Sequence, residues 1–437
     1  MNFRVLFLYV LSVVANTAAH AQSTNSARED TPLEQARAAI ARGYTTSADR
    51  ALAVVGDDVA DINDLDFLRG SVAVLKGDFD SGVAHFRAIL ARDPSLNRVR
   101  LDLAQAYFQK GDDTAAIYHF RAALAQGVPP EVAQNIARFL QQLRSRKKWD
   151  ASISAAVVPD SNINAATTAD SIDVFGLPFT LDPTAQQQSG IGLSVGGAAA
   201  YRLPLSEHTR LKLGASYFDT EYINNKFSDR NLGAQIGPSF ILSGDDEVAV
   251  LASASRRWLF GKTFTNSTGL RLEGQSALSS RWLAAGAVSW ENRKYEAPYA
   301  DYTGPVYTAN AALSYALDAS SLLQGTAGVV RERANVDALR SWQYIVSTTY
   351  FIENLVGRFA VGFGVQAALV RYDAMQVAFG KIRRDKQVDY RVNISNANLD
   401  VWGFTPVINL THADRYSNIN LFTYHRNRAE LGVRRNF

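Results

Sequence analysis

The pattern of apolar and polar positions changes at about residue 149. After that point apolar residues alternate with small or polar ones, which is the period of a β-strand with one apolar face. The clearest run is RFAVGFGVQAALVRY, residues 358–372, where one face carries Phe, Val, Ala and Leu and the other Gly, Ala and Gln. A soluble sheet normally carries charges on its outer face, so this second face favours a wall that lines a water-filled lumen.

The alternation predicts fourteen strands. They lie near residues 149–158, 189–202, 208–221, 229–242, 247–257, 265–278, 281–294, 305–317, 320–333, 340–352, 358–372, 385–397, 404–416 and 427–437. Five links are short (PLSEH, SGDD, SS, DAS and ENLVG), and those between them are longer, for example 159–188. Strictly alternating short and long links are typical of an antiparallel transmembrane β-barrel with short periplasmic turns and longer outside loops. A soluble β-sandwich or lectin is the alternative, which the length of the strands disfavours.

Aromatic residues recur where the predicted strands approach the loops. We expect them to form the interfacial girdles of a membrane barrel. They are Tyr217, Tyr222, Trp258, Trp290, Tyr295 and Tyr372.

Before residue 149 the apolar residues follow a helical period, and residues 77–90 match residues 111–124 at an offset of 34. This is the period of the tetratricopeptide repeat, and the residue types resemble that repeat. We expect further helices at 32–43 and 47–55, and a capping helix at 130–146. The expected packing positions are Gly70, Phe86, Pro94, Ala104, Tyr107, Ala116 and Phe120. Such a stack presents a curved surface that binds an extended peptide or another protein; a rigid spacer is the alternative.

Residues 1–21 have the organisation of a secretory signal peptide, with Arg4, an apolar run at 5–14 and an A-x-A site that ends at Ala21. We therefore expect a periplasmic tetratricopeptide-repeat domain at 22–146 and an outer-membrane β-barrel at 147–437. The chain has no Cys, which excludes disulfides and a lipid-bearing cysteine. No later run approaches about 18 consecutive apolar residues, which excludes transmembrane helices.

Charge adds little. The formal net charge is +3, and we find no basic tract of the kind that binds nucleic acid. The run RSRKKW, residues 144–149, joins the two halves and fits either phospholipid headgroups or a solvated linker. The run GKT at 261–263 lacks the first glycine of a phosphate-binding loop, because Arg256 stands there, and it falls in a predicted outside loop.

No residue pattern predicts catalysis, a cofactor or a metal, so we expect a protein that is not an enzyme. His85 and His119 occupy equivalent repeat positions, which explains them better than a metal site does. His412 and His425 lie late in the barrel without a serine nucleophile motif, so they do not predict a hydrolase.

The last predicted strand, AELGVRRNF, places Leu431, Val433 and Phe437 on one apolar face. A final strand of this kind is similar to the signal that the barrel-assembly machinery reads, and it must pair with the first strand to close the barrel. Arg435 interrupts the apolar face, and we expect it near the periplasmic interface, within reach of lipid phosphates.

Four stretches carry a resemblance to a known family. VVPDSNINAA (157–166), WGFTPVINL (402–410), SNINLFTYHRNRAELGV (417–433) and the final Phe437 resemble the surface lipoprotein assembly modulator (Slam) family of outer-membrane proteins. The two-domain order also matches that family, whose barrel has fourteen strands.

The resemblance implies transport of a lipoprotein, or in some relatives of a soluble haem-binding protein, from the periplasm to the cell surface. The repeats would engage this client or a periplasmic chaperone, and the barrel would give passage. Asp160, Ser161, Asn162 and Asn164 would form an ordered polar structure at the barrel mouth or inside the lumen. A turn needed only for folding is the alternative for these four residues.

An exopolysaccharide export porin is the second interpretation, because such porins also join tetratricopeptide repeats to a barrel. Those exporters tend to have many more repeats, sixteen strands and an acidic lumen, which count against it. A barrel hydrolase lacks its nucleophile motif here, and a passive porin leaves the repeats unexplained.

Overall fold

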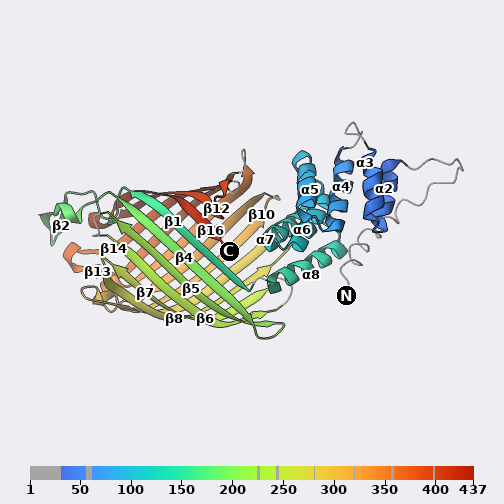
Figure 1. Cartoon of the computed structure of the whole chain (residues 1–437). Coiled ribbons are helices and arrows are strands. Elements are labelled where there is room, and N and C mark those ends of the chain that lie inside the picture. The colour runs from blue at the N-terminus through green and yellow to red at the C-terminus, as the bar shows by residue number, and fades with distance from the viewer. Residues whose placement is uncertain are drawn as a thin grey trace. The chain divides into compact units, whose positions relative to one another are not determined.

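The computed structural model describes residues 31–55, 62–146, 148–223, 227–242, 246–279, 281–318, 320–355, 359–396 and 399–437. The expected signal peptide and the side chains of the basic run at 144–147 lie outside the described part. Contacts divide the chain into two compact units, Met1–Leu143 and Arg144–Phe437 (Figure 1). None of the described helices combines the length and hydropathy that crossing a membrane requires.

In the described residues, the first unit consists of three helix pairs followed by α8, whose last turn lies past the boundary at Leu143. The helices are α2 (Pro32–Ala41), α3 (Thr45–Ala53), α4 (Ile62–Lys76), α5 (Phe79–Arg92), α6 (Asn97–Lys110), α7 (Asp113–Gln126) and α8 (Pro130–Arg146). Asp78 and Asp112, 34 residues apart, cap α5 and α7 alike: each carboxylate accepts the N–H three residues on, at 3.1 and 3.0 Å. The preceding Gly77 and Gly111 both have φ +87°, which glycine adopts without strain. The sequence repeat is therefore a repeat of turn and cap geometry.

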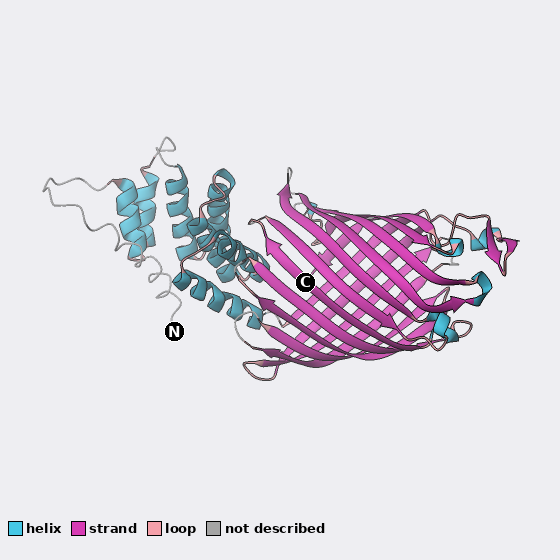
Figure 2. Ribbon diagram, turned by 180° about the vertical axis from the view of Figure 1, so that it is seen from behind, coloured by secondary structure: helices cyan, strands magenta, loops and turns pink. Residues whose placement is uncertain are grey.

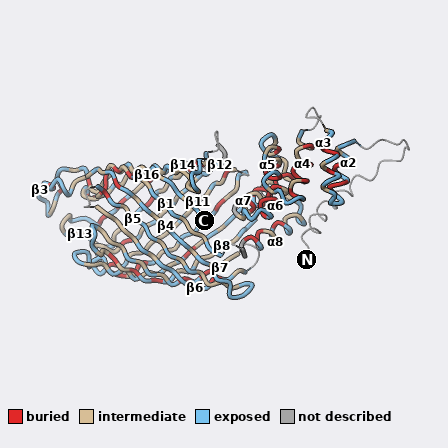
Figure 3. Tube along the Cα trace, in the orientation of Figure 1, coloured by how far each residue is buried: buried red, intermediate tan, exposed pale blue. Residues whose placement is uncertain are grey.

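The core of the helical unit lies between the helices, where the buried segments concentrate (Figure 3). A Cβ atom on Gly70 of α4 would lie 2.9 Å from Cε1 of Phe86 on α5, so the close approach of these helices depends on glycine. In the second pair, Ala104 and Ala116 are fully buried and Phe120 is 2% exposed. Three apolar residues of α8 join the same core: Ile136, Leu140 and Leu143.

Over the described residues, the second unit is a closed antiparallel barrel of fourteen strands, which confirms the predicted fold class (Figure 2). The strands are β1 (Trp149–Asp160), β4 (Gly190–Pro204), β5 (Thr209–Tyr222), β6 (Asp229–Ile241), β7 (Glu247–Leu259), β8 (Lys262–Ala277), β9 (Trp282–Tyr295), β10 (Gly304–Ala316), β11 (Ser321–Glu332), β12 (Ser341–Leu355), β13 (Phe359–Gln376), β14 (Lys381–Ser395), β15 (Thr405–Ser417) and β16 (Tyr424–Asn436). Neighbours in the chain pair with each other, and β1 closes on β16.

The predicted strict alternation of short and long links is wrong. One of the links at the end of the barrel that is predicted to face the outside of the cell joins β7 to β8. This link is only Phe260 and Gly261, with φ +55° and +73°. Positive φ at both positions is the geometry of a two-residue hairpin, which the sequence disguises because Phe rarely adopts it. The run GKT therefore lies at this tight turn and the start of β8, and not in a loop. The longest link also holds an unpredicted hairpin, β2 (Ser171–Val174) and β3 (Leu177–Thr180).

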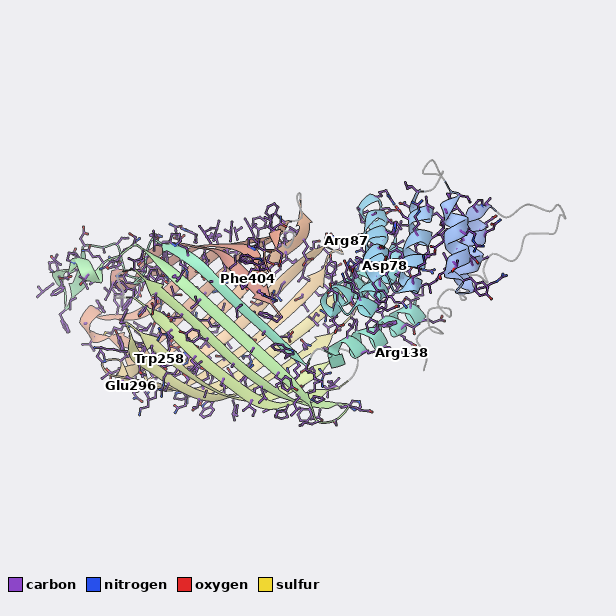
Figure 4. The ribbon with its side chains drawn as sticks, in the orientation of Figure 1. Asp78, Arg87, Arg138, Trp258, Glu296 and Phe404 are labelled. Carbon is purple, nitrogen blue, oxygen red and sulfur yellow. The ribbon has the colours of Figure 1, made fainter. Side chains whose placement is uncertain are left out.

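The barrel wall is apolar outside and polar inside. On β4, Ile191 and Leu193 are 51% and 58% exposed on the outer face, whereas the residue that follows each of them on the inner face is Gly192 or Ser194. Side chains line the whole wall in Figure 4, with Trp258 and Glu296 labelled near one end of the barrel. Such a wall suits a barrel surrounded by lipid.

The expected aromatic girdle is partly wrong. Tyr217 and Trp290 lie on the outer face, 38% and 41% exposed. Tyr222 instead faces the interior, only 4% exposed, and the inward Tyr372 lies 4.8 Å below the guanidinium of Arg383. All six aromatic residues were predicted in the girdle because they lie near loops. The alternation along each strand, however, sends neighbouring positions to opposite faces of the wall.

Candidate functional site

Asp160 is the last residue of β1, at the end of the barrel where the longest link begins; this end is called the outer end below. Its carboxylate connects β1 to two other strands. It accepts hydrogen bonds from Nη2 of Arg426 on β16 at 2.5 Å and from the hydroxyl of Tyr222 on β5 at 3.0 Å. The N–H of Asn162 donates to its other oxygen at 2.9 Å. The Asp160 side chain is fully buried, so removing one partner would leave a buried charge uncompensated.

The next three motif residues hold the first loop against the barrel. Ser161 and Asn427 of β16 bond reciprocally: the N–H of Ser161 donates to the Asn427 carbonyl at 2.9 Å, and the N–H of Asn427 donates to Ser161 Oγ at 2.8 Å. The fully buried Asn162 amide donates to the carbonyl of His425 at 3.1 Å. Asn164 donates to the carbonyl of Gln186 at 2.7 Å, on the returning end of the same loop. The structure thus places all four motif residues together, as one polar cluster at the outer end of β1.

Two partners in this cluster, Arg426 and Tyr222, were not predicted as site residues. Arg426 lies within a stretch that carried the family resemblance, and its alternation with outward His425 and Asn427 marks it as an inward position on the last strand. Tyr222 was assigned to the outer girdle. Following the alternation through each strand to its end would have found both.

The inner wall is lined by paired charges of both signs. Lys212 of β5 contacts Glu247 and Glu273 at 2.8 and 3.4 Å. Asp385 of β14 is fully buried between Arg383 and Arg415. Further inward pairs are Arg293–Glu291, Arg293–Glu332, Arg391–Asp389 and Arg428–Glu430. The described lumen is therefore strongly polar, with negative charges held beside positive ones.

Ordinary protein contacts surround His85, His119, His412 and His425. His85 contacts Asp66 at 3.0 Å, whereas His119 stacks on Tyr107 with ring centres 5.5 Å apart. Burial lowers the pKa of His119 to about 4. His412 and His425 share Asp414 on the outer face of β15 and β16. Within the described residues, no three His, Cys, Asp or Glu side chains are grouped to hold a metal ion.

The residues of the final strand meet β1 along most of its length. Val433 pairs with Ala155 and Leu431 with Val157, and the N–H of Phe437 donates to the carbonyl of Ala151 at 2.9 Å. Arg435 donates to the carbonyl of Trp402 at 3.1 Å, and its guanidinium lies 4.6 Å from the ring centre of Phe437. Arg435 therefore has partners within the protein, and its expected reach toward lipid phosphates stays a prediction.

Remaining packing positions lie in the helical unit. Tyr107 is 9% exposed within the core of α6 and α7. The carbonyl of Pro94, between α5 and α6, accepts hydrogen bonds from Arg100 at 2.8 Å and Gln126 at 3.2 Å. Pro94 therefore fixes the link between the two repeats to both helices that follow it.

The chain is similar to proteins of a known family. The profile described as "Surface lipoprotein assembly modifier" matches residues 149–437, and one described as "Tetratricopeptide repeat" matches residues 67–129. Surface lipoprotein assembly modifier 1 of Haemophilus influenzae is 24% identical over 83% of this chain and 75% of its own length. The protein of the same name from Neisseria meningitidis serogroup B is 23% identical over 85% and 75%.

Solved structures are more distant. The match to the outer-membrane channel DcaP of Acinetobacter baumannii covers 66% of this chain and 96% of that one, at 10% identity and a TM-score of 0.38. The family profile, in contrast, spans the whole barrel from its first strand to Phe437. This chain belongs to the surface lipoprotein assembly modifier family.

Proposed function

We propose that this outer-membrane protein moves a lipid-modified protein from the periplasm to the cell surface. The polypeptide of the client passes through the barrel, while the helical repeats in the periplasm engage the client or a chaperone that delivers it. A soluble, haem-binding client is an alternative cargo of the same path. The observation that carries the proposal is the match of the family profile to the entire barrel.

The polar lumen supports the passage of a polypeptide. It contains close pairs of opposite charge, such as Arg391–Asp389 and Arg428–Glu430, and each partner reduces the field of the other. A chain of mixed side chains can pass such a wall without being held by one strong field. An anionic polysaccharide would instead meet carboxylates next to every paired cation named above.

The test is deletion of the gene, followed by biotin labelling of lipoproteins on intact cells. We expect at least one lipoprotein to lose surface labelling while its total amount is unchanged, and the full chain supplied on a plasmid to restore it. Unchanged labelling of every surface lipoprotein would contradict the proposal. Reduced exopolysaccharide with normal labelling would favour an export porin instead.

A further inference from the structure

The lumen is a poor route for the lipid part of a lipid-modified client. Its wall carries charges such as Lys212, Glu273 and Asp389, which face water or one another. Moving an acyl chain from a bilayer into water is strongly unfavourable, and the free-energy cost grows with every CH₂ group that is exposed. If the client is lipid-modified, as proposed above, its acyl chains need a path beside the lumen that stays in lipid.

The strand β1 is joined unequally to its two neighbours. Toward β4, all twelve of its residues, Trp149–Asp160, are paired. Toward β16, pairing covers Ser152 to Val157 and resumes only at Asp160, which makes seven residues. Every other ladder between described barrel strands pairs at least eleven residues. The line between β1 and β16, here called the seam, is therefore the shortest ladder of the described wall.

The interruption of the seam has a chemical cause. Pro159 lies in the unpaired stretch and has no backbone N–H to donate. Beyond it, the seam is held by the Asp160–Arg426 pair and by the reciprocal bonds of Ser161 and Asn427. Closure of the outer end thus depends on one backbone pair at Asp160, the backbone bond from Ser161 to Asn427 and a few side-chain contacts, instead of a continuous backbone ladder.

A groove of about 710 Å³ lies beside the interruption. Pro159 and Ala429 contribute small side chains to its lining. Ile191, Tyr390 and Leu410 also line it; they are 51%, 49% and 42% exposed and lie on the outer, lipid-facing side of their strands. The polar residues His412 and Asn427 lie at its rim on the same face. A hollow between larger apolar side chains on this face suits a flexible hydrocarbon chain.

We propose that this groove binds an acyl chain of the lipid-modified client, and that the seam parts beside it. The polypeptide then occupies the lumen while its lipid stays outside the wall, and the short segment joining them crosses between β1 and β16. The groove supplies the apolar contact, and the interrupted ladder supplies the line that opens at the lowest cost in backbone hydrogen bonds.

A disulfide lock tests the opening of the seam, and the absence of native Cys makes the lock clean. Ala155→Cys with Val433→Cys joins paired residues of β1 and β16. Ala311→Cys with Ala327→Cys joins paired residues of β10 and β11 and is the matched control. Both full-length proteins are assembled, brought to equal surface levels and compared oxidised and reduced, so that an assembly defect affects both states of one protein.

The readout is arrival outside the cell of the lipoprotein that depends on this gene, and of the same client made without its lipid-bearing Cys behind an ordinary secretory signal peptide. We expect the oxidised seam lock to slow display of the lipidated client at least tenfold, reductant to restore it, and the control lock to have no effect. The client without lipid should pass either lock. Display at the unlocked rate, or equal block of both client forms, would overturn the proposal.

A binding measurement separates this inference from the proposed function. Purified full-length protein in liposomes is exposed to a tripalmitoyl lipopeptide with a photoreactive acyl chain, and labelled residues are mapped. We expect labelling around Pro159, Ala429 and Leu410 above that of a phospholipid with the same photoreactive chain. Ala429→Phe should reduce it at least fivefold, whereas Ala234→Phe on the outer face of β6 should not. Equal labelling by the phospholipid would overturn the groove, whether or not the gene deletion affects display.

Discussion

In the helical unit the large, fully buried side chains are apolar, such as Leu65, Ile89 and Leu103, whereas in the barrel they include Asn162 and Asp385. The exposed side chains of the barrel also differ from those expected of a protein in water. Outward positions of the barrel carry residues such as Val288, 50% exposed, and Leu270, 54% exposed. Apolar side chains thus face the interior of the helical unit and the exterior of the barrel.

The difference reflects two solvents. Water surrounds the helical unit, so its stability comes from burying apolar surface between helices. Lipid surrounds the barrel, so outward apolar residues need no partner within the protein, and specificity lies in inward polar contacts and in the closed ladder. Substitutions of the same kind should therefore have different effects in the two units.

The largest expected effect comes from the helical core. Phe86→Ala removes a ring that is 2% exposed and packs on Gly70, which should cost about 3–5 kcal/mol. Phe175→Ala, at a ring 72% exposed in the turn between β2 and β3, is the matched control and should cost almost nothing. Thermal loss of circular dichroism at 222 nm, with the full chain in detergent, measures both. Equal midpoints would show that Phe86 does not hold the repeat together.

Next comes the buried charge at the outer end of the seam. Asp160→Asn leaves Arg426 without its partner and should destabilise the barrel by about 3–5 kcal/mol. Asp150→Asn is the control on the same strand, because its pair with Arg202 is partly exposed and should be worth about 0–1 kcal/mol. Heat-dependent mobility on gels reports barrel unfolding, and Arg426→Gln added to Asp160→Asn should recover part of the loss. If Asp150→Asn destabilised the barrel as much as Asp160→Asn does, burial would not explain the effect of Asp160.

The outer face provides a third test. Val288→Arg places a charge at the middle of β9 toward the lipid and should cost about 2–4 kcal/mol. Ser289→Arg, on the next residue, points into the polar lumen and should be tolerated far better. The measurement is the folded fraction of each variant in the outer membrane. Equal losses from both variants would mean that the two faces of the wall are not distinguished in this way.

The sequence predicted what depends on periodicity. The alternation of apolar and polar residues along each strand predicted the barrel, and the 34-residue offset predicted the helix pairs. Burial on one face of an element enforces both periods. It did not predict contacts between distant residues at the outer end, such as Asp160 with Arg426 and Tyr222, because the register between first and last strand is set by closure of the whole barrel. Nor did it predict the turn at Phe260, whose positive φ is imposed by the strands it connects.

The smallest expected effect concerns the final strand, which ends the ladder with β1. Deleting Phe437 removes one backbone hydrogen bond to Ala151, worth about 0.5–1.5 kcal/mol, and the apolar end of the strand. We expect a lower folded level in the outer membrane, because this strand resembles the signal for barrel assembly. Arg435→Tyr should leave the level unchanged: the position lies on the outer face, where an aromatic residue suits the membrane interface, although its bond to Trp402 is lost. Quantifying folded protein per cell compares the two variants. A normal level after the deletion would show that closure of the seam rests on residues 431–436 and the outer cluster alone.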